Sequence, residues 1–221
     1  MTSASASAAP RTPGARRRPR VTGDDREAAI LATAERLLTE RNIAEISVDD
    51  LARGAGISRP TFYFYFGSKD AVVVALLSGV IRDAERQLDG IFDDARGARS
   101  AGWRDVIAAF FQAFGAHPSI VGAAAQELPT SAEIATMWSA ALQDWISRVA
   151  DGILAERARG AAPMTVSARD LATALVLLNE RFLRSIFAGE SAAPNSDAAI
   201  DVLAHIWTAS IYGLATPQAE G

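Results

Sequence analysis

The chain has 221 residues and a mass of 23.3 kDa, which corresponds to one large domain or two small ones. Hydrophobic residues make up 49% of it and charged residues 22%, so it has enough apolar material for a core and is not disordered as a whole. It has no cysteine and only two histidines, which excludes disulfides, thiol nucleophiles and most zinc sites. We therefore expect no cofactor and no metal.

The net charge of −4 hides a basic N-terminus. Residues 1–22 are rich in Ser, Ala and Pro and carry five arginines and no acid; residues 1–70 sum to +2 and the rest of the chain to −6. We predict that residues 1–22 form a disordered arm, which either contacts DNA phosphates or the minor groove, or is only a solubilising tail. There is no apolar signal region and no long uncharged apolar run, so we expect a cytoplasmic protein without a membrane partner.

Helical periodicity runs through the chain and strand patterns are nearly absent, which predicts an all-α fold of about nine helices. The first helix is expected to start at Gly23 and close at Asn42, and the next two are capped by Ser47 and Ser58. A long helix should follow from Ser68 to about residue 95. Further helices are expected at 101–115, 118–127, 131–159, 167–188 and 196–213. The expected division is an arm at 1–22, a helix-turn-helix domain at 23–67, an effector-binding and dimerisation domain at 68–215, and a tail at 216–221.

The segment 47–69 places two short helices around a glycine-containing turn, after a supporting helix, which is helix-turn-helix spacing. Polar groups at the start of the second short helix are what a reader of the DNA major groove needs, and tyrosine hydroxyls and a lysine suit phosphates. The bulky Phe64 either packs on the supporting helix or contacts a thymine methyl. The expected DNA-binding residues are Ser47, Val48, Ser58, Arg59, Pro60, Thr61, Tyr63, Phe64, Tyr65 and Lys69.

This segment resembles the DNA-binding domain of the TetR family of transcriptional repressors. The matching residues are Ile46-Ser47-Val48, Leu51-Ala52, Ala55-Gly56-Ile57-Ser58, Thr61-Phe62-Tyr63, Tyr65-Phe66 and Ser68-Lys69-Asp70. The resemblance implies an Ω-shaped all-α homodimer whose two heads occupy successive major grooves. It also implies that the larger C-terminal domain binds a small effector.

A closer resemblance, to a mycobacterial member of the family, extends over most of the chain. It is carried by Trp103, Phe110, Trp138, Trp145, Asn179-Glu180-Arg181 and His205-Ile206-Trp207. That member represses the gene of a flavin-dependent monooxygenase, which the resemblance suggests as a target. This chain departs from it at Arg148, Val149 and Val176, which makes the expected pocket less polar near Val176.

Apolar and aromatic residues recur at helical spacing in the C-terminal part, as in Trp103, Ile107, Phe110 and Phe114. Such stripes are often simply core; here the four tryptophans and the resemblance favour a pocket for a hydrophobic small molecule. Asn179 is expected to hydrogen-bond the ligand, or else to be satisfied by a neighbouring helix. The expected ligand-binding residues are Trp103, Ile107, Phe110, Phe114, Met137, Trp138, Leu142, Trp145, Val149, Val176, Asn179, Leu183 and Trp207.

The last two helices, 167–188 and 196–213, carry apolar residues on more than one face, and the family pattern implies that they pair with their copies in a homodimer. A two-fold dimer requires a roughly palindromic double-stranded operator. We therefore predict a ligand-responsive repressor; an activator or a small-ligand carrier of the same fold remain alternatives.

An enzyme is disfavoured because no GxSxG motif occurs and because His117 and His205 lack a nearby Ser/Asp pattern. We expect His205 to be a core or interface residue.

Overall fold

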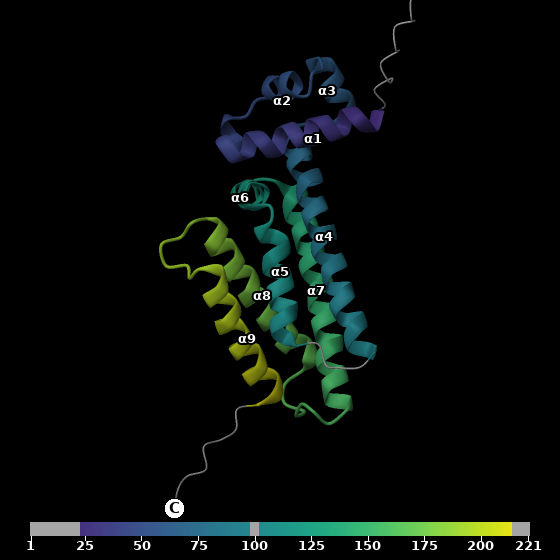
Figure 1. Ribbon diagram of the computed structural model, residues 1–221, viewed down its shortest axis with the longest axis vertical. Helices are drawn as coiled ribbons and strands as arrows, with labels where there is room; N and C mark the ends of the chain where they lie inside the picture. Colours follow the sequence, from purple (N-terminus) through teal and green to yellow (C-terminus); the bar gives the residue numbers. More distant parts are fainter. Residues whose placement is uncertain (1–22, 98–101, 214–221) are drawn as a thin grey trace, which may run out of the picture.

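The computed structural model describes residues 23–97 and 102–213, and within these ranges the chain forms nine α-helices and one 3₁₀ turn (Figure 1). The elements are α1 (Gly23–Glu40), η1 (Ile43–Glu45), α2 (Val48–Gly54), α3 (Arg59–Tyr65), α4 (Lys69–Gly97), α5 (Trp103–Gly115), α6 (Pro118–Glu127), α7 (Ala132–Ala158), α8 (Ala168–Phe187) and α9 (Ser196–Tyr212). The predicted all-α fold is confirmed. The first helix ends at Glu40, two residues earlier than expected. The predicted arm and the tail at 216–221 lie outside the described residues.

Helices α1, α2 and α3, with η1, form a small head at one end of the molecule (Figure 1). The inner face of α1 buries Ile30 and Leu37, and Leu51 of α2 and Phe62 of α3 belong to the same core. The turn between α2 and α3 requires a glycine, because Gly56 has a φ of 68°, in the left-handed region. These contacts fix the angle between α2 and α3, and they leave the outer face of α3 exposed to solvent.

A second glycine lets α2 lie close against α1. A Cβ atom on Gly54 would stand 2.3 Å from Cγ2 of Thr33, which is buried on α1. Any larger residue at position 54 would therefore push the two helices apart. This close approach sets the position of the helix-turn-helix on its supporting helix.

The long helix α4 starts in the head directly after α3 and runs down the length of the body (Figure 1). Its inner face buries Val73, Leu77 and Ala84. It packs against α1 in the head and against α5, α6 and α7 in the body. One continuous helix thus touches both the DNA-reading module and the walls of the body.

The body consists of α5 to α9 around an aromatic core. Proline at position 118 starts α6, and the side chains of Ser131, Ser167 and Asn195 cap α7, α8 and α9. Helix α7 packs along α8, and α5 lies between α4 and α9. Among the largest fully buried side chains are Phe114 and Trp207. The stripes seen in the sequence therefore point inward.

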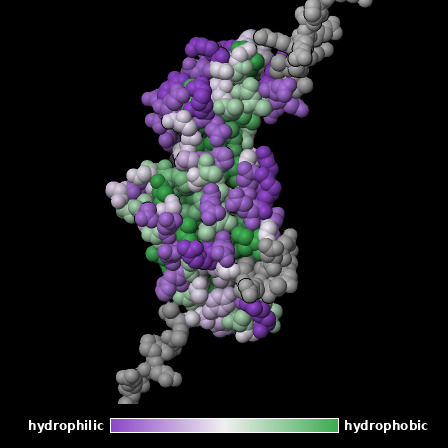
Figure 2. Space-filling model, viewed as in Figure 1, coloured by the Kyte–Doolittle hydropathy of each residue, from purple (hydrophilic) through white to green (hydrophobic). Residues whose placement is uncertain are grey.

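Some apolar side chains remain on the surface of α8 and α9. Leu177 is 45% exposed and Val202 is 47% exposed. In Figure 2 hydrophilic residues cover much of the head, and hydrophobic residues show at the waist and on the body. Among the described residues no single helix is both long and apolar enough to span a membrane; two bent pairs, α3 with α4 and α5 with α6, meet the test only when joined.

Candidate DNA-binding surface and interior cavities

The outer face of α3 presents aromatic side chains to solvent. Phe64 is 83% exposed and Tyr63 is 45% exposed, and the Phe64 ring meets only the edge of Tyr65 within the helix, at 5.2 Å between ring centroids. The alternative that Phe64 packs on the supporting helix is therefore wrong. An exposed phenyl ring costs solvation energy in the free protein, so this face has the character of a contact surface.

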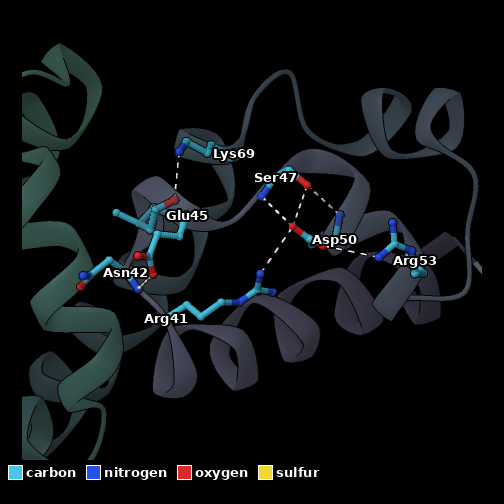
Figure 3. Close-up of polar contacts among 8 residues, drawn as sticks. Arg41, Asn42, Glu45, Ser47, Asp50, Arg53 and Lys69 are labelled. Atoms are coloured by element: carbon cyan, nitrogen blue, oxygen red, sulfur yellow. Dashed lines mark hydrogen bonds and ion pairs between the residues drawn. The ribbon is translucent and has the colours of Figure 1, made fainter.

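The two serines predicted to contact DNA act first as helix caps. The Ser47 hydroxyl accepts a hydrogen bond from the amide of Asp50 at 3.1 Å and donates to its carboxylate at 2.7 Å (Figure 3). The bond that the Ser47 hydroxyl donates, together with one from the Ser47 amide, holds the pKa of the Asp50 carboxylate below its ordinary value. Ser58 likewise accepts from the amide of Thr61 and pairs with the Thr61 hydroxyl at 2.8 Å. Ser47 thus fixes the start of α2, and Ser58 fixes the start of α3.

Asp50 also gathers two arginines that the sequence did not single out. Arg41 lies 3.7 Å and Arg53 3.6 Å from its carboxylate oxygens (Figure 3). Arg53, whose side chain is 78% exposed, stands at the end of α2 beside the turn. It was not among the DNA-binding residues expected from the sequence, although its place at the end of the first short helix was an available signal.

The Arg59 guanidinium on α3 already has partners within the head. It pairs with Asp49 at 2.9 Å, donates to the Tyr63 hydroxyl at 3.4 Å and lies 5.8 Å from the Tyr63 ring centroid. The Tyr63 hydroxyl and the Asp49 charge raise the pKa of Arg59 above its ordinary value. Arg59 is thus held in place on an exposed face, and a phosphate would have to compete with Asp49 for it.

Lys69, the first residue of α4, has an internal partner as well. Its ammonium donates to the backbone oxygen of Ile43 in η1 at 2.9 Å (Figure 3). The side chain is half-buried. An ammonium has three donors, so one can hold η1 while the others remain for an anion. The predicted phosphate contact of Lys69 remains a prediction, and the residue also ties α4 to the head.

Two small apolar cavities lie inside the body. The first, here called the Trp145 cavity, has a volume of about 30 Å³, room for about two water molecules. Its lining comes from α4, α5, α7, α8 and α9: Leu88, Val106, Phe110, Trp145, Arg148, Val149, Val176, Asn179 and Trp207. The second, here called the Trp138 cavity, has about 20 Å³ and is lined from α4, α6, α7 and α8, with one residue beyond α6: Leu77, Val121, Ala124, Ala125, Leu128, Ile134, Trp138, Leu183 and Arg184.

An aromatic cluster contains rings from the walls of both cavities. The Trp138 and Trp145 ring centroids lie 5.7 Å apart, and Phe114 meets both rings edge-on at 5.6 and 5.8 Å. Phe110 packs on Trp145 at 4.8 Å, also edge-on. Edge-to-face packing at these distances is favourable, so the cluster is cohesive. Its rings would have to move for a drug-sized molecule to enter.

The predicted ligand residues divide among these places. Those lining the Trp145 cavity are Phe110, Trp145, Val149, Val176, Asn179 and Trp207, and those lining the Trp138 cavity are Trp138 and Leu183. The residues absent from both linings are Trp103, Ile107, Phe114, Met137 and Leu142. The indole of Trp103 instead donates to the Tyr212 hydroxyl at 3.0 Å, and the Met137 sulfur accepts from Ser78 at 2.9 Å. The sequence missed Leu88 and Val106, whose signal was the apolar face of their helices.

Asn179 is buried and has a partner on the neighbouring helix. Its side-chain oxygen accepts from the Trp207 indole nitrogen at 3.1 Å. The oxygen of the Asn179 side chain is therefore satisfied by the neighbouring helix α9, which matches the second of the two alternatives.

The expectation for His205 is corrected in part. His205 is exposed on α9 and is not a core residue, because it lies on the outer face of the helix, away from Trp207.

The head and the body together define a helix-turn-helix regulator with an apolar interior. The chain belongs to the TetR family of transcriptional regulators: the family model "Bacterial regulatory proteins, tetR family" matches residues 30–76, and "Transcriptional regulator EthR, C-terminal domain" matches residues 103–213. It is closely related to the HTH-type transcriptional regulator EthR of Mycobacterium tuberculosis, with 51% identity over 96% of this chain and 99% of that protein. Identity to EthR of Mycolicibacterium smegmatis is 49%, over 92% of this chain and 94% of that protein.

Solved structures share the fold at low identity. A TetR-family regulator from Syntrophomonas wolfei superposes with a TM-score of 0.67 at 15% identity and covers 88% of this chain and 100% of its own. NalD, the secondary repressor of the MexAB-OprM multidrug efflux pump in Pseudomonas aeruginosa, gives 0.66 at 19% identity, over 85% and 95% of the two chains. The family consists of transcriptional regulators, so the chain is not an enzyme.

Proposed function

We propose that the protein is a ligand-responsive repressor that binds a palindromic operator as a homodimer and is released by a hydrophobic small molecule. The observation that carries the proposal is the course of α4. This helix begins at Lys69, directly after the reading helix, and supplies Leu77 to the Trp138 cavity and Leu88 to the Trp145 cavity. Any molecule that widens either cavity presses on the helix that carries the head.

The small volume of both cavities bears on the mechanism. With room for only a few waters, the described conformation does not hold a drug-sized effector, so binding must separate the aromatic rings and shift the helices that carry them. An effector that binds this widened state better than the closed one changes the populations of the two. In a dimer, a shift of α4 alters the distance between the two heads and weakens binding to two half-sites at once.

The proposed dimer uses the outer faces of α8 and α9. Leu177 and Val202 are about half exposed there, and one protomer offers them no cover. Pairing of these two helices with their copies would bury them in an isologous interface. Which gene is controlled stays a prediction; the resemblance described above suggests that of a flavin-dependent monooxygenase.

The proposal is tested with purified protein and a labelled fragment of the DNA upstream of its own gene. A shift of the fragment in a gel at low salt, reversed by a hydrophobic ligand, is the expected result. A variant with Phe64→Ala should need about five times more protein to shift the fragment, which ties the shift to α3. Failure of the wild-type protein to bind the fragment would contradict the repressor function, and increased transcription on binding would indicate an activator.

A further inference from the structure

The guanidinium of Arg59 is held from two sides by the two short helices of the head. Arg59 is the first residue of α3, and it donates to a carboxylate oxygen of Asp49, in the first turn of α2, at 2.9 Å. It also donates to the Tyr63 hydroxyl at 3.4 Å and lies 5.8 Å from the centre of the Tyr63 ring. These contacts leave the planar guanidinium far fewer orientations than an arginine without partners has.

The ion pair between Asp49 and Arg59 contributes little to the stability of the head. The side chains are 52% and 55% exposed, and water and salt weaken the attraction between exposed charges. The neighbouring acid, Asp50, caps α2 through the Ser47 hydroxyl and amide. Among the described residues the Asp49 carboxylate binds only Arg59. Its position therefore points to a role in directing Arg59.

Arg59 keeps donors for a further partner while both of these contacts are in place. A guanidinium has five N–H groups in one plane, and Asp49 and Tyr63 use one on each terminal nitrogen. Each terminal nitrogen keeps one further N–H group, and Nε keeps its own. Two N–H groups of one guanidinium match the O6 and N7 acceptors that guanine presents in the major groove. The bound Arg59 can therefore still read a guanine.

The same carboxylate makes Arg59 a poor partner for phosphates. A phosphate that approaches Arg59 is repelled by Asp49 and has to displace it from the guanidinium. The edge of a guanine carries no net charge, so it does not meet this repulsion. Asp49 thus disfavours the contact that every DNA sequence offers and leaves the contact that depends on a base.

We propose that Arg59 reads a guanine in each half-site of the operator, and that Asp49 is the positioning residue that makes this contact selective. The inference rests on the proposed function, because it names what the reading helix recognises. Without the Asp49 carboxylate, Arg59 is free to bind phosphates of any sequence. The head then binds all DNA more tightly and distinguishes the operator less well.

The first measurement compares the DNA upstream of the gene with an unrelated fragment of equal length, at several salt concentrations. Asp49→Asn should bind the unrelated fragment about three- to tenfold more tightly, with a salt slope about 0.9 steeper, because Arg59 becomes a phosphate contact. Its affinity for the upstream fragment should change by less than about twofold, because the gained phosphate contact offsets the weakened guanine contact. The preference for the upstream fragment therefore falls.

Glu40→Gln is the matched control for this charge change. It also removes one exposed acid of the head, but Glu40 pairs with Arg36 within α1. Its preference for the upstream fragment should stay near that of the wild-type protein. Asp49→Asn should keep its melting temperature, because the pair that it breaks is exposed.

The second measurement identifies the base. Guanines in the part of the upstream fragment that the protein protects from nuclease are replaced one at a time by 7-deazaguanine, which pairs normally but lacks the N7 acceptor. One replacement in each half-site should weaken the wild-type protein at least about fivefold and have no further effect on Arg59→Ala. Arg59→Lys keeps the charge without the fork, so it should still bind unrelated DNA but lose this penalty. Asp49→Asn should show a smaller penalty at the same base, which a purely structural role of Asp49 would not produce.

Three results would overturn the assignment. They are equal effects of every replacement on the wild-type and Arg59→Ala proteins, an unchanged preference and penalty in Asp49→Asn, and an equal rise of its affinity for both fragments, which would make Asp49 only a general repulsive charge. Both measurements are made without a ligand, so a ligand that fails to release the DNA contradicts the proposed function alone. A wild-type protein that binds both fragments equally contradicts both proposals.

Discussion

The Nδ1 atom of His117 and a carboxylate oxygen of Glu35 lie 3.0 Å apart across the junction of head and body. His117 directly precedes α6, and Glu35 projects from α1. Near the other end of α6, the Gln126 amide nitrogen lies 3.4 Å from the side-chain oxygen of Asn42. Helix α6 also lines the Trp138 cavity through Val121. This contact therefore gives the body a second connection to the head, besides α4.

Removal of the Glu35 carboxylate should weaken the coupling between the cavities and the head. In Glu35→Ala we expect the ligand concentration for half-release of the promoter fragment to rise by at least about threefold, while ligand affinity without DNA stays within about twofold. The measurement pairs a gel-shift titration with a thermal-shift titration. Arg36→Ala is the control, because Arg36 pairs with Glu40 on the same helix and is exposed. An unchanged release curve in Glu35→Ala would show that α4 alone transmits the signal.

The lowered pKa of Asp50 predicts an acid-sensitive head. A carboxylate whose pKa is lower in the folded state stabilises the fold above its unfolded pKa, near 3.8, and this contribution is lost as the pH falls through the lower folded value. The wild-type protein should therefore unfold at a higher temperature than Asp50→Asn at neutral pH, and the difference should shrink in strongly acidic buffer. Thermal unfolding of both proteins across the acid range measures it. A difference that does not depend on pH would contradict the assignment to the Ser47 bonds.

The local features of the head were predictable, and the long-range ones were not. Ser47 and Ser58 cap the helices that follow them, and Gly56 takes the positive φ of the turn, because such features depend on residues three or four apart. The bond from Lys69 to Ile43 spans 26 residues and depends on how α4 meets η1. No periodicity in the sequence encodes that meeting.

In the interior of the body, too, the local features were predictable from the sequence and the long-range ones were not. Helical spacing predicted that Phe114 and Trp145 point inward, and both are buried. Spacing could not say that Phe114 would lie in the aromatic cluster without lining either cavity, because that depends on the ring orientations of two helices packed together. The partner of Asn179 likewise comes from another helix, 28 residues away.

The Asn179–Trp207 bond should contribute to stability without any ligand. In Asn179→Ala the buried Trp207 indole loses its acceptor, so we expect the free energy of unfolding to fall by about 1–3 kcal/mol. Urea denaturation measures this change. Thr173→Ala on the same helix is the control, because that hydroxyl only bonds the backbone oxygen of Arg169 within α8. Wild-type stability in Asn179→Ala would mean that the indole finds another acceptor.

The exposed Phe64 ring is expected to read a thymine methyl group. Phe64→Ala should leave the melting temperature unchanged, since the side chain is 83% exposed, but should weaken operator binding about fivefold. Replacing thymines by uracils one at a time in the operator removes single methyl groups. One such replacement should weaken the wild-type protein and have no further effect on Phe64→Ala. If every replacement affects both proteins equally, Phe64 does not read a methyl group.

The charge of the head predicts that the arginine-rich arm takes part in DNA binding. Residues 23–70 hold six basic and nine acidic residues, so without residues 1–22 the head is net negative and would be repelled by phosphates. Two of its cations, Arg59 and Lys69, already have internal partners. Replacing the five arm arginines by glutamine should reduce the magnitude of the slope of log affinity against log salt by up to about 4.5, since each phosphate contact contributes about 0.9. Replacement by lysine, which keeps the charge, should keep most of the slope. Equal slopes for the wild-type and glutamine proteins would make the arm a solubilising tail.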